Sequence, residues 1–163
     1  MKVIKNFLED SFFQDLKKLV IESEFSWFKR KNMLKNNNDD LGYFTHSFFN
    51  NNTINCKYYN QYILPILNQL EVKAPIEVRA NLSPSCFYKK NACAFHVDRD
   101  YDSKTAILYL NDCNGGTEFK INNKIELVKA EENKIVIFDT NTQHRGTKST
   151  DQDFRYIINF NYF

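Results

Sequence analysis

Short β-strand patterns follow one another at regular spacing through the second half of this 163-residue chain, and they constrain its fold more than any other feature. Clear turn sequences separate them, among them Asn114-Gly115-Gly116 and the two-residue hairpin Asn122-Asn123. Such strands after a helical first half predict an α+β, mainly β fold, a sheet sandwich or jelly-roll barrel with N-terminal helices packed on the outside. The predicted strands cover residues 76–82, 92–97, 104–111, 117–121, 124–128, 134–138 and 154–162.

The last predicted strand has two different faces, because alternate residues of a strand point to opposite sides. An aromatic and aliphatic face is expected to pack on the helices, and the face that carries Arg155 is expected to point into the barrel. A buried guanidinium needs an anionic partner, and either a protein carboxylate or a ligand carboxylate can supply it. The inward face consists of Arg155, Ile157, Asn159 and Asn161, and the outward face of Phe154, Tyr156, Ile158, Phe160 and Tyr162.

The first half of the chain predicts helices and short strands. The expected strands cover residues 3–8, 25–28 and 43–49. An amphipathic helix is expected over residues 11–23, with Ser11 and Gln14 in a capping box. A second helix is expected from Asn52 or Thr53 to residue 70, kinked or split at Pro65.

Two features of the first half leave alternatives open. The polar segment 29–41 lacks apolar anchors and is expected to be a solvated loop. Residues 29–42 could act as a lid over a nearby site or be an inert surface insertion. His46 lies outside any metal-ligand spacing, and we interpret it as structural, with a role beside the substrate as the alternative.

Length and charge limit the partners and the compartment. We expect residues 1–163 to form a single domain. The formal net charge of +2 gives little support for a nucleic-acid partner, since the basic cluster Lys29, Arg30, Lys31 and Lys35 is equally well explained as a solvated loop. The four cysteines form no CxxC pair and indicate free thiols in a reducing cytosol. No apolar run is long enough for a signal peptide or a membrane span, so we expect a cytoplasmic protein without a membrane partner.

The sequence His96-Val97-Asp98 suggests a metal site. In an extended segment the side chains of residues i and i+2 lie on the same face, so His96 and Asp98 can converge on one ion. His144, one of three histidines in the chain, would complete the set from another strand. Two histidines and one carboxylate on one side of a metal leave the opposite positions open, an arrangement that suits non-haem Fe(II). An isolated His-x-Asp is more often part of an ordinary surface turn, so this prediction depends on its context.

Several motifs in register resemble the Fe(II)/2-oxoglutarate-dependent dioxygenase superfamily. His96-x-Asp98, His144 and Arg155 occur in the order and spacing of that superfamily. The sequence Tyr-Leu-Asn at 109–111, followed by Gly-Gly-Thr at 115–117, is similar to its prolyl 4-hydroxylase-like branch. The whole chain also resembles the short oxygenases of tailed phages of marine bacteria, which would place it in the cytoplasm of the host cell.

The resemblance implies a double-stranded β-helix (jelly-roll) fold and a set of site residues. Fe(II) would be held by His96, Asp98 and His144. The co-substrate 2-oxoglutarate would chelate the iron and pair its far carboxylate with Arg155. Tyr109 would donate its hydroxyl to that same carboxylate.

The resemblance also implies which residues line the co-substrate pocket. Ile157 and Asn159 would line it. The family usually carries a co-substrate-binding tyrosine on the strand before His-x-Asp, whereas residues 79–82 here read Arg-Ala-Asn-Leu. Asn81 would take the place of that tyrosine, or Tyr88 would reach in from the following loop.

The implied reaction consumes O2 and converts 2-oxoglutarate to succinate and CO2 while a substrate C–H bond is hydroxylated. The branch resemblance suggests a peptide or protein substrate, with proline first. Two alternatives remain open: the same chemistry on a nucleobase or a free small molecule, and a non-catalytic barrel that binds a metal or a carboxylate.

Overall fold

The computed structural model describes residues 1–22, 25–30, 42–86 and 92–163. Its strands are β1 (Lys2–Ile4), β2 (Phe28–Arg30), β3 (Tyr43–Asn50), β4 (Thr53–Ile54), β5 (Pro75–Pro84), β6 (Lys104–Tyr109), β7 (Gly116–Ile121), β8 (Lys124–Lys129), β9 (Lys134–Asp139), β10 (His144–Thr147) and β11 (Phe154–Tyr162). Its helical segments are α1 (Asp10–Lys17), the π-helical η1 (Lys18–Glu22), the π-helical η2 (Tyr59–Ile63) and α2 (Leu64–Gln69).

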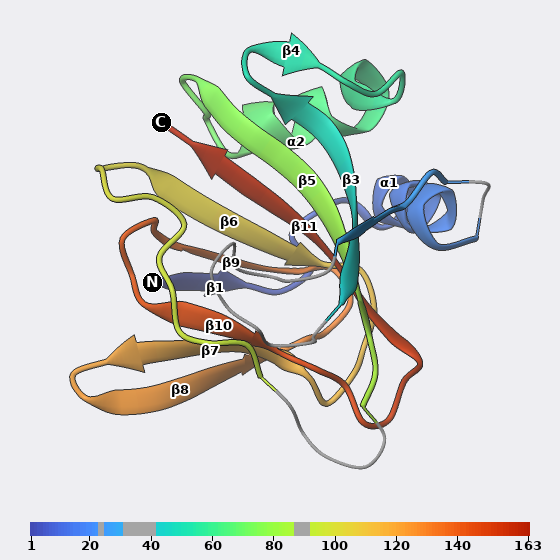
Figure 1. Cartoon of the computed structure of the whole chain (residues 1–163). Coiled ribbons are helices and arrows are strands. Elements are labelled where there is room, and N and C mark those ends of the chain that lie inside the picture. The colour runs from blue at the N-terminus through green and yellow to red at the C-terminus, as the bar shows by residue number, and fades with distance from the viewer. Residues whose placement is uncertain (23–24, 31–41, 87–91) are drawn as a thin grey trace.

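Within the described residues, the strands form two antiparallel sheets (Figure 1). The larger sheet has eight strands in the order β1-β9-β6-β11-β5-β3-β2, with β4 paired to β3. The smaller sheet has three strands in the order β10-β7-β8. Because the chain crosses repeatedly between the two antiparallel sheets, the architecture is a jelly roll, and the predicted mainly β fold class is confirmed.

The region around the predicted strand 92–97 differs from the prediction. Residues 92–98 form no continuous strand, and they meet β10 through isolated bridges at Ala92–Thr147 and His96–His144. The sequence analysis gave no bounds for β10, a short strand that pairs with β7. The hairpin between β7 and β8 is confirmed, because Asn122 and Asn123 both have positive φ, as a tight two-residue turn requires.

The first helical segment lies close to its predicted position, but its cap differs. The carboxylate of Glu9 accepts hydrogen bonds from the backbone N–H groups of Ser11 and Phe12, so Glu9 is the N-cap and the predicted capping box at Ser11 is wrong. The longer Glu side chain reaches both N–H groups from one residue earlier. The helix continues through η1 to Glu22.

The second helix begins later than predicted. Asn51 and Asn52 have positive φ and form a tight turn, after which Thr53 and Ile54 pair with β3 as β4. A helix cannot start at a residue that is already in a hairpin, so the helical segment begins at Tyr59. The segments η2 and α2 are contiguous, and Pro65 lies where the helix passes from the π-helical to the α-helical pattern, so the helix changes there without a break.

The strands predicted near the N-terminus are shorter in the structure. The strand expected over residues 3–8 covers only Lys2–Ile4, because Asn6 has a positive φ and turns the chain. Phe25 lies outside β2, and its ring packs on His46 and Phe48. The predicted loop and lid segment falls mostly on residues 31–41, which lie outside the described residues.

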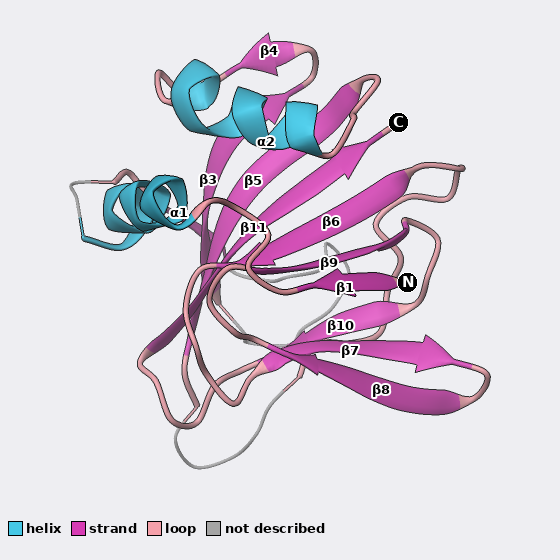
Figure 2. Cartoon of the chain, turned by 180° about the vertical axis from the view of Figure 1, so that it is seen from behind, coloured by secondary structure: helices cyan, strands magenta, loops and turns pink. Residues whose placement is uncertain are grey.

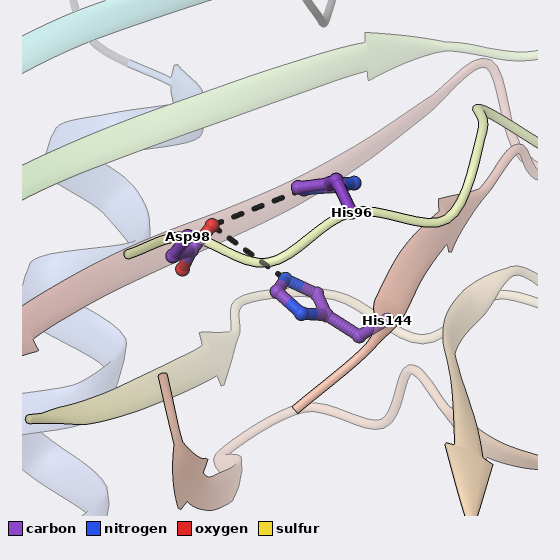
Figure 3. A group of neighbouring side chains, drawn as sticks. All are labelled: His96, Asp98 and His144. Atoms are coloured by element: carbon purple, nitrogen blue, oxygen red, sulfur yellow. Dashed lines mark ion pairs between the residues drawn. The ribbon is translucent and has the colours of Figure 1, made fainter. Parts of the chain in front are cut away.

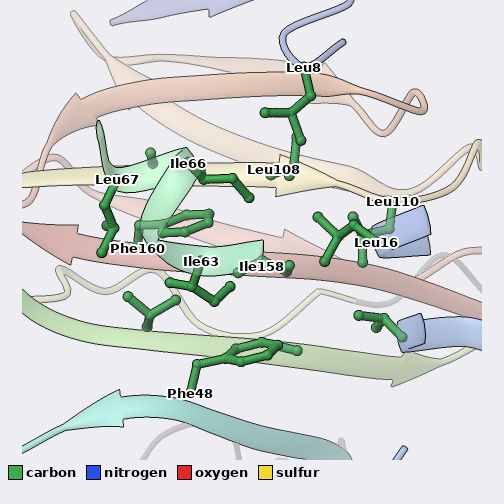
Figure 4. Close-up of a cluster of buried hydrophobic side chains, with 14 of the residues drawn as sticks. Leu8, Leu16, Phe48, Ile63, Ile66, Leu67, Leu108, Leu110, Ile158 and Phe160 are labelled. Carbon is green, nitrogen blue, oxygen red and sulfur yellow. The ribbon is translucent and has the colours of Figure 1, made fainter. Parts of the chain in front are cut away.

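The helices cover the outer face of the larger sheet, as Figure 2 shows from behind. The main core lies between this face and the helices, and Figure 4 shows Ile63 and Ile66 of the helices against Phe160 of β11. A second core that includes Ile107, Phe119 and Val136 lies between the two sheets. The predicted division of β11 is confirmed, because Ile158 and Phe160 belong to the first core whereas Ile157 belongs to the second.

Candidate functional site

Three side chains capable of binding a metal lie close together where the segment before β6 meets β10: His96, Asp98 and His144. One ligand atom from each of the three lies within 4.8 Å of the others (Figure 3). His96 and Asp98 come from the extended segment before β6, and His144 begins β10. Reciprocal backbone hydrogen bonds of 3.0 and 2.9 Å join His96 to His144 and hold the two segments side by side.

Both imidazoles are oriented by backbone carbonyls. Nδ1 of His96 lies 3.1 Å from the carbonyl oxygen of Ala94, and Nδ1 of His144 lies 2.9 Å from that of Thr142. A carbonyl only accepts hydrogen bonds, so in each ring Nδ1 carries the proton and Nε2 presents a lone pair. Oδ1 of Asp98 lies 3.8 Å from Nε2 of His96 and 3.6 Å from Nε2 of His144. All three lone-pair atoms therefore face the same point.

The carboxylate of Asp98 is held by its other oxygen. Oδ2 lies 3.1 Å from the hydroxyl of Thr105 and accepts a 2.9 Å hydrogen bond from Nδ2 of Asn161. These two partners leave Oδ1 directed at the imidazoles. Second-shell partners of this kind fix the direction in which a ligand atom points.

The charge state of the cluster suits a cation. Burial opposes ionisation of Asp98, but the facing imidazole of His144 and the hydrogen bond from Asn161 outweigh it and lower the pKa of this carboxyl. Burial lowers the pKa of His144 and outweighs the facing carboxylate of Asp98, which raises it. Asp98 is thus charged and His144 neutral at neutral pH, as metal ligation requires.

A cavity runs from this cluster toward Arg155. It has a volume of about 70 Å³, and His96, Asp98, His144 and Arg155 all line it. Arg155 is 2% exposed, and its Nε and Nη1 atoms have no hydrogen-bond partner within the part of the chain that the structure describes. A buried guanidinium without an anion is costly, so this end of the cavity is built for a carboxylate or a similar anion.

The predicted pocket residues Asn81, Ile157 and Asn159 also line the cavity. Asn81 is buried on β5 opposite Ile157 of β11, and its Oδ1 has no hydrogen-bond partner among the described residues. Its amide is therefore available to a ligand. The alternative residue, Tyr88, lies outside the described residues.

Tyr109 lies behind the cavity wall instead of on it. Its hydroxyl donates a 2.8 Å hydrogen bond to Oγ1 of Thr117, and it is Thr117 that lines the cavity. Complete burial raises the pKa of Tyr109 to about 12, so the hydroxyl stays protonated. In the structure the hydroxyl of Tyr109 is bound to Thr117, and its direct contact with the co-substrate stays a prediction.

His46 lies apart from the cluster. Its ring packs against Phe25 and Phe48, and its Nδ1 is 2.8 Å from the carbonyl oxygen of Ser26. His46 also lines a groove over β2, β3 and β5, so the structural interpretation and the role beside the substrate both stay predictions.

Sequence reasoning gave no role to several residues of the site. Thr105, Asn161, Thr117 and Arg79 hold the cluster or line the cavity. The alternation of the last strand already placed Asn161 on the inward face with Arg155, and the same alternation could have indicated Arg79, which shares a face with Asn81. Thr105 and Thr117 depend on contacts between different strands, for which the sequence has no local signal.

Comparison with known proteins identifies the family of this fold. Residues 85–163, which contain the cluster and Arg155, match the model of the 2OG-Fe(II) oxygenase superfamily. A search of curated protein sequences gives no significant match. No helix within the described residues is long and apolar enough to cross a bilayer.

Solved structures share the fold over nearly the whole chain. A Trichoplax adhaerens prolyl hydroxylase in complex with a hypoxia-inducible factor peptide fragment is 16% identical, with a TM-score of 0.70 over 99% of this chain and 82% of that one. A Pseudomonas putida prolyl-4-hydroxylase is 16% identical, with a TM-score of 0.68 over 99% and 91%. The epimerase SnoN, in complex with Fe3+, alpha ketoglutarate and nogalamycin RO, is 10% identical, with a TM-score of 0.67 over 99% and 77%.

Proposed function

The chain belongs to the 2OG-Fe(II) oxygenase superfamily, and from this premise we propose that it hydroxylates a C–H bond of a peptide or protein. The members of this superfamily are oxidoreductases that use Fe(II), 2-oxoglutarate and O2. A prolyl residue is the first candidate for the hydroxylated position. The products would be the hydroxylated peptide, succinate and CO2.

The metal ligands in this proposal are His96, Asp98 and His144. Their three facing atoms, Nε2, Oδ1 and Nε2, occupy one side of a common point and would leave the other side to small ligands. The donor set of two imidazoles and one carboxylate suits Fe(II). Hydrogen bonds to Ala94, Thr142, Thr105 and Asn161 hold these ligands in place before any metal binds.

The observation that carries the proposal is that Nε and Nη1 of Arg155, in the same cavity as this cluster, have no hydrogen-bond partner among the described residues. The co-substrate 2-oxoglutarate has two carboxylates, and Arg155 would pair with the one far from the metal. A guanidinium can bind a carboxylate through two parallel hydrogen bonds, which fixes the orientation of the ligand as well as its position. Asn81, Thr117 and Asn159 would contact the rest of the co-substrate.

When bound, Fe(II), 2-oxoglutarate and O2 supply the oxidising chemistry that inserts oxygen into a C–H bond. The contribution of the chain is to ligate, to orient and to exclude water. His144 and Ile157 are buried, and Ile157 adds an apolar wall that would limit the access of water to the cavity.

The dimensions of the cavity support a large substrate that approaches from outside. With a volume of about 70 Å³ the cavity is small, and the co-substrate would occupy it without leaving room for a second molecule. The main substrate must therefore present its reacting group at the mouth, as a residue of a polypeptide can. The fold shared with a prolyl hydroxylase in complex with a peptide is consistent with this proposal.

The test begins with the protein purified without oxygen and searched for retained 2-oxoglutarate by native mass spectrometry. Pooled proline-containing peptides and, separately, pooled small metabolites are then added in air. We expect succinate release together with a mass increase of one oxygen on proline in a peptide. Release coupled only to a small molecule would reject the peptide substrate in favour of the small-molecule alternative, for which the shared fold of SnoN is the supporting observation. The Asp98→Ala variant serves as the inactive control.

A further inference from the structure

A groove next to the metal-ligand cluster contains charges that the proposed reaction does not use. It lies over β2, β3 and β5, has a volume of about 390 Å³, and is lined in part by Phe28, Arg30, Ser47, Glu77 and Arg79. In Figure 1 the strands β3 and β5 lie away from the three-stranded sheet, toward the β2 edge of the larger sheet. This volume is in the range of sites that hold a ligand larger than a diacid.

Strand register places the groove beside the site. Arg79 of β5 lies opposite Asn159 of β11 on one side and Ser47 of β3 on the other. Residues directly opposite one another share a face, and neighbouring strands are about 4.8 Å apart. Arg79 therefore lines both the cavity and the groove, one strand away from Asn159.

Two arginines beside this groove, Arg79 and Arg99, share one acidic side chain, Glu77. Arg99 donates a 2.9 Å hydrogen bond to Oε2 of Glu77, whereas Arg79 reaches Oε1 of the same carboxylate at only 3.4 Å. One carboxylate thus serves two guanidinium groups, and the shorter bond belongs to Arg99. The Nε of Arg79 is buried and has no hydrogen-bond partner within the described part of the chain.

The edge of the groove adds a further cation and an apolar surface. Arg30 of β2 lies at this edge, and its Nε donates a 3.3 Å hydrogen bond to the hydroxyl of Thr45. Beside it Phe28 is 63% exposed, which is unusual for a phenylalanine and suits an apolar contact with a ligand. The groove therefore combines two arginines with one aromatic ring.

We propose that this groove binds an acidic segment of the polypeptide substrate, with Arg79 and Arg30 as the residues that select a carboxylate next to the hydroxylated position. The inference rests on the proposed function, because it takes the groove to hold the substrate of that reaction. A peptide is favoured over a nucleic acid because two arginines and one exposed ring suit a short acidic segment, whereas a phosphate backbone needs a longer basic track.

Binding without turnover tests the inference. The protein is loaded with Fe(II) and 2-oxoglutarate under anaerobic conditions, and fluorescence anisotropy measures the affinity for short labelled peptides with Asp-Pro-Asp, Asn-Pro-Asn or Lys-Pro-Lys at their centre. We expect the Asp peptide to bind about tenfold more tightly than the Asn peptide, which corresponds to one charge-assisted hydrogen bond in a partly exposed groove. Added salt should reduce this preference.

Four variants connect the preference to the groove. Arg79→Gln should remove it, and Arg30→Glu should shift it toward the Lys peptide. Glu77→Gln should strengthen binding of the Asp peptide, because it removes the carboxylate that competes for Arg79. The matched control is Lys124→Gln, which removes one positive charge on exposed β8 and should leave the preference as it is in the unaltered protein. If Arg79→Gln fails to fold, as judged by circular dichroism, Arg30→Glu and Glu77→Gln still show whether the preference for the Asp peptide depends on the groove.

Equal affinity for the Asp and Asn peptides would overturn the inference, as would an equal effect of Lys124→Gln and Arg79→Gln. A single-stranded oligonucleotide is added as a competitor beside the unlabelled Asp peptide. If the oligonucleotide displaces the labelled Asp peptide at a lower concentration than the unlabelled Asp peptide does, the groove is a nucleic-acid site and the inference is overturned. The reaction is tested separately when air is admitted. Charge-selective binding without any hydroxylation would contradict the proposed function and leave the groove assignment standing.

Discussion

Oδ1 of Asp98 lies 3.6 Å from Nε2 of His144, although the two residues belong to segments that are separated by β6, β7, β8 and β9. Only the folded jelly roll brings them together, and the bridge between His96 and His144 fixes their distance. If these atoms are metal ligands, removing one of them must affect metal binding far more than it affects the fold.

The first prediction concerns Asp98→Ala. We expect the affinity for Fe(II) to fall by at least about 100-fold, since loss of a ligand should exceed the loss typical of second-shell changes. Succinate formation should cease, while the circular dichroism spectrum stays the same. The control is His46→Gln, which removes the histidine outside the cluster and should leave Fe(II) affinity unchanged. Succinate formation at the normal rate in Asp98→Ala would reject the ligand assignment.

The second prediction concerns Arg155→Lys. The variant keeps the positive charge but loses the two-pronged geometry, a loss of about 1.5–3 kcal/mol for a charge-assisted contact. The concentration of 2-oxoglutarate needed for half-maximal succinate formation should therefore rise about 10- to 100-fold. Anaerobic titration with Fe(II) alone should be unaffected. An unchanged requirement for 2-oxoglutarate would place its far carboxylate elsewhere.

Tyr109→Phe separates a direct contact from an indirect one. The hydroxyl of Tyr109 binds Thr117 and lies behind the cavity wall. Its loss should reduce the free energy of unfolding by about 1 kcal/mol, measured by urea denaturation, and change the 2-oxoglutarate requirement less than Arg155→Lys does. The comparison variant Thr117→Val removes the hydroxyl that lines the cavity and should have the larger effect on 2-oxoglutarate. If Tyr109→Phe has the larger effect, Tyr109 contacts the co-substrate directly.

The sequence predicted the strands and two of the three cluster residues because these depend on local patterns, whereas His144 was added from its order and spacing in the resembled superfamily. Alternating strand residues identified the inward face of β11, and His-x-Asp in an extended segment identified two candidate ligands. Errors arose where one pattern has two meanings. The dipeptide Asn-Asn was recognised as a turn at 122–123 but assigned to a helix start at 52, although Asn51 and Asn52 adopt the same positive φ.

The parts of the site that the sequence did not predict come from contacts between distant strands. Thr105 of β6 and Asn161 of β11 meet at Oδ2 of Asp98, and no spacing along the chain relates these three residues. The hydrogen bond from Tyr109 to Thr117 of β7, which lines the cavity, likewise joins two strands that no spacing along the chain relates. Such relationships depend on strand order and register, which the tertiary structure determines.

The fourth prediction concerns acid stability in the presence of a chelator. Burial lowers the pKa of His144 in the folded chain, so the unfolded chain binds more protons once the pH falls below about 6.5. Stability should therefore decrease as the pH falls through 6.5 toward the folded pKa. The lowered pKa of Asp98 acts in the same direction at lower pH. Urea midpoints at pH 7 and pH 5 measure the loss, and His144→Gln should reduce it; an equal loss in both proteins would contradict this role of His144.

The last prediction concerns Asn161→Ala, which leaves the metal ligands in place and removes a hydrogen bond to one of them. Nδ2 of Asn161 lies 2.9 Å from Oδ2 of Asp98 and 2.9 Å from the hydroxyl of Thr105, so it fixes the direction of the carboxylate. Without it, Asp98 should turn more freely, and Fe(II) affinity should fall about 10- to 100-fold, as is typical for second-shell partners.

Two comparisons distinguish this orienting role from general destabilisation. Ile158 of β11 packs in the core between the larger sheet and the helices, on the face of the strand away from the cluster. Ile158→Val should lower the free energy of unfolding by about 1 kcal/mol without changing Fe(II) affinity. Asn161→Gln keeps the amide but displaces it by one methylene, and it should recover little of the lost affinity if direction is what matters. Calorimetric titration with Fe(II) under anaerobic conditions measures all three variants. Equal Fe(II) affinity in Asn161→Ala and the unaltered protein would mean that Thr105 alone suffices to hold Asp98.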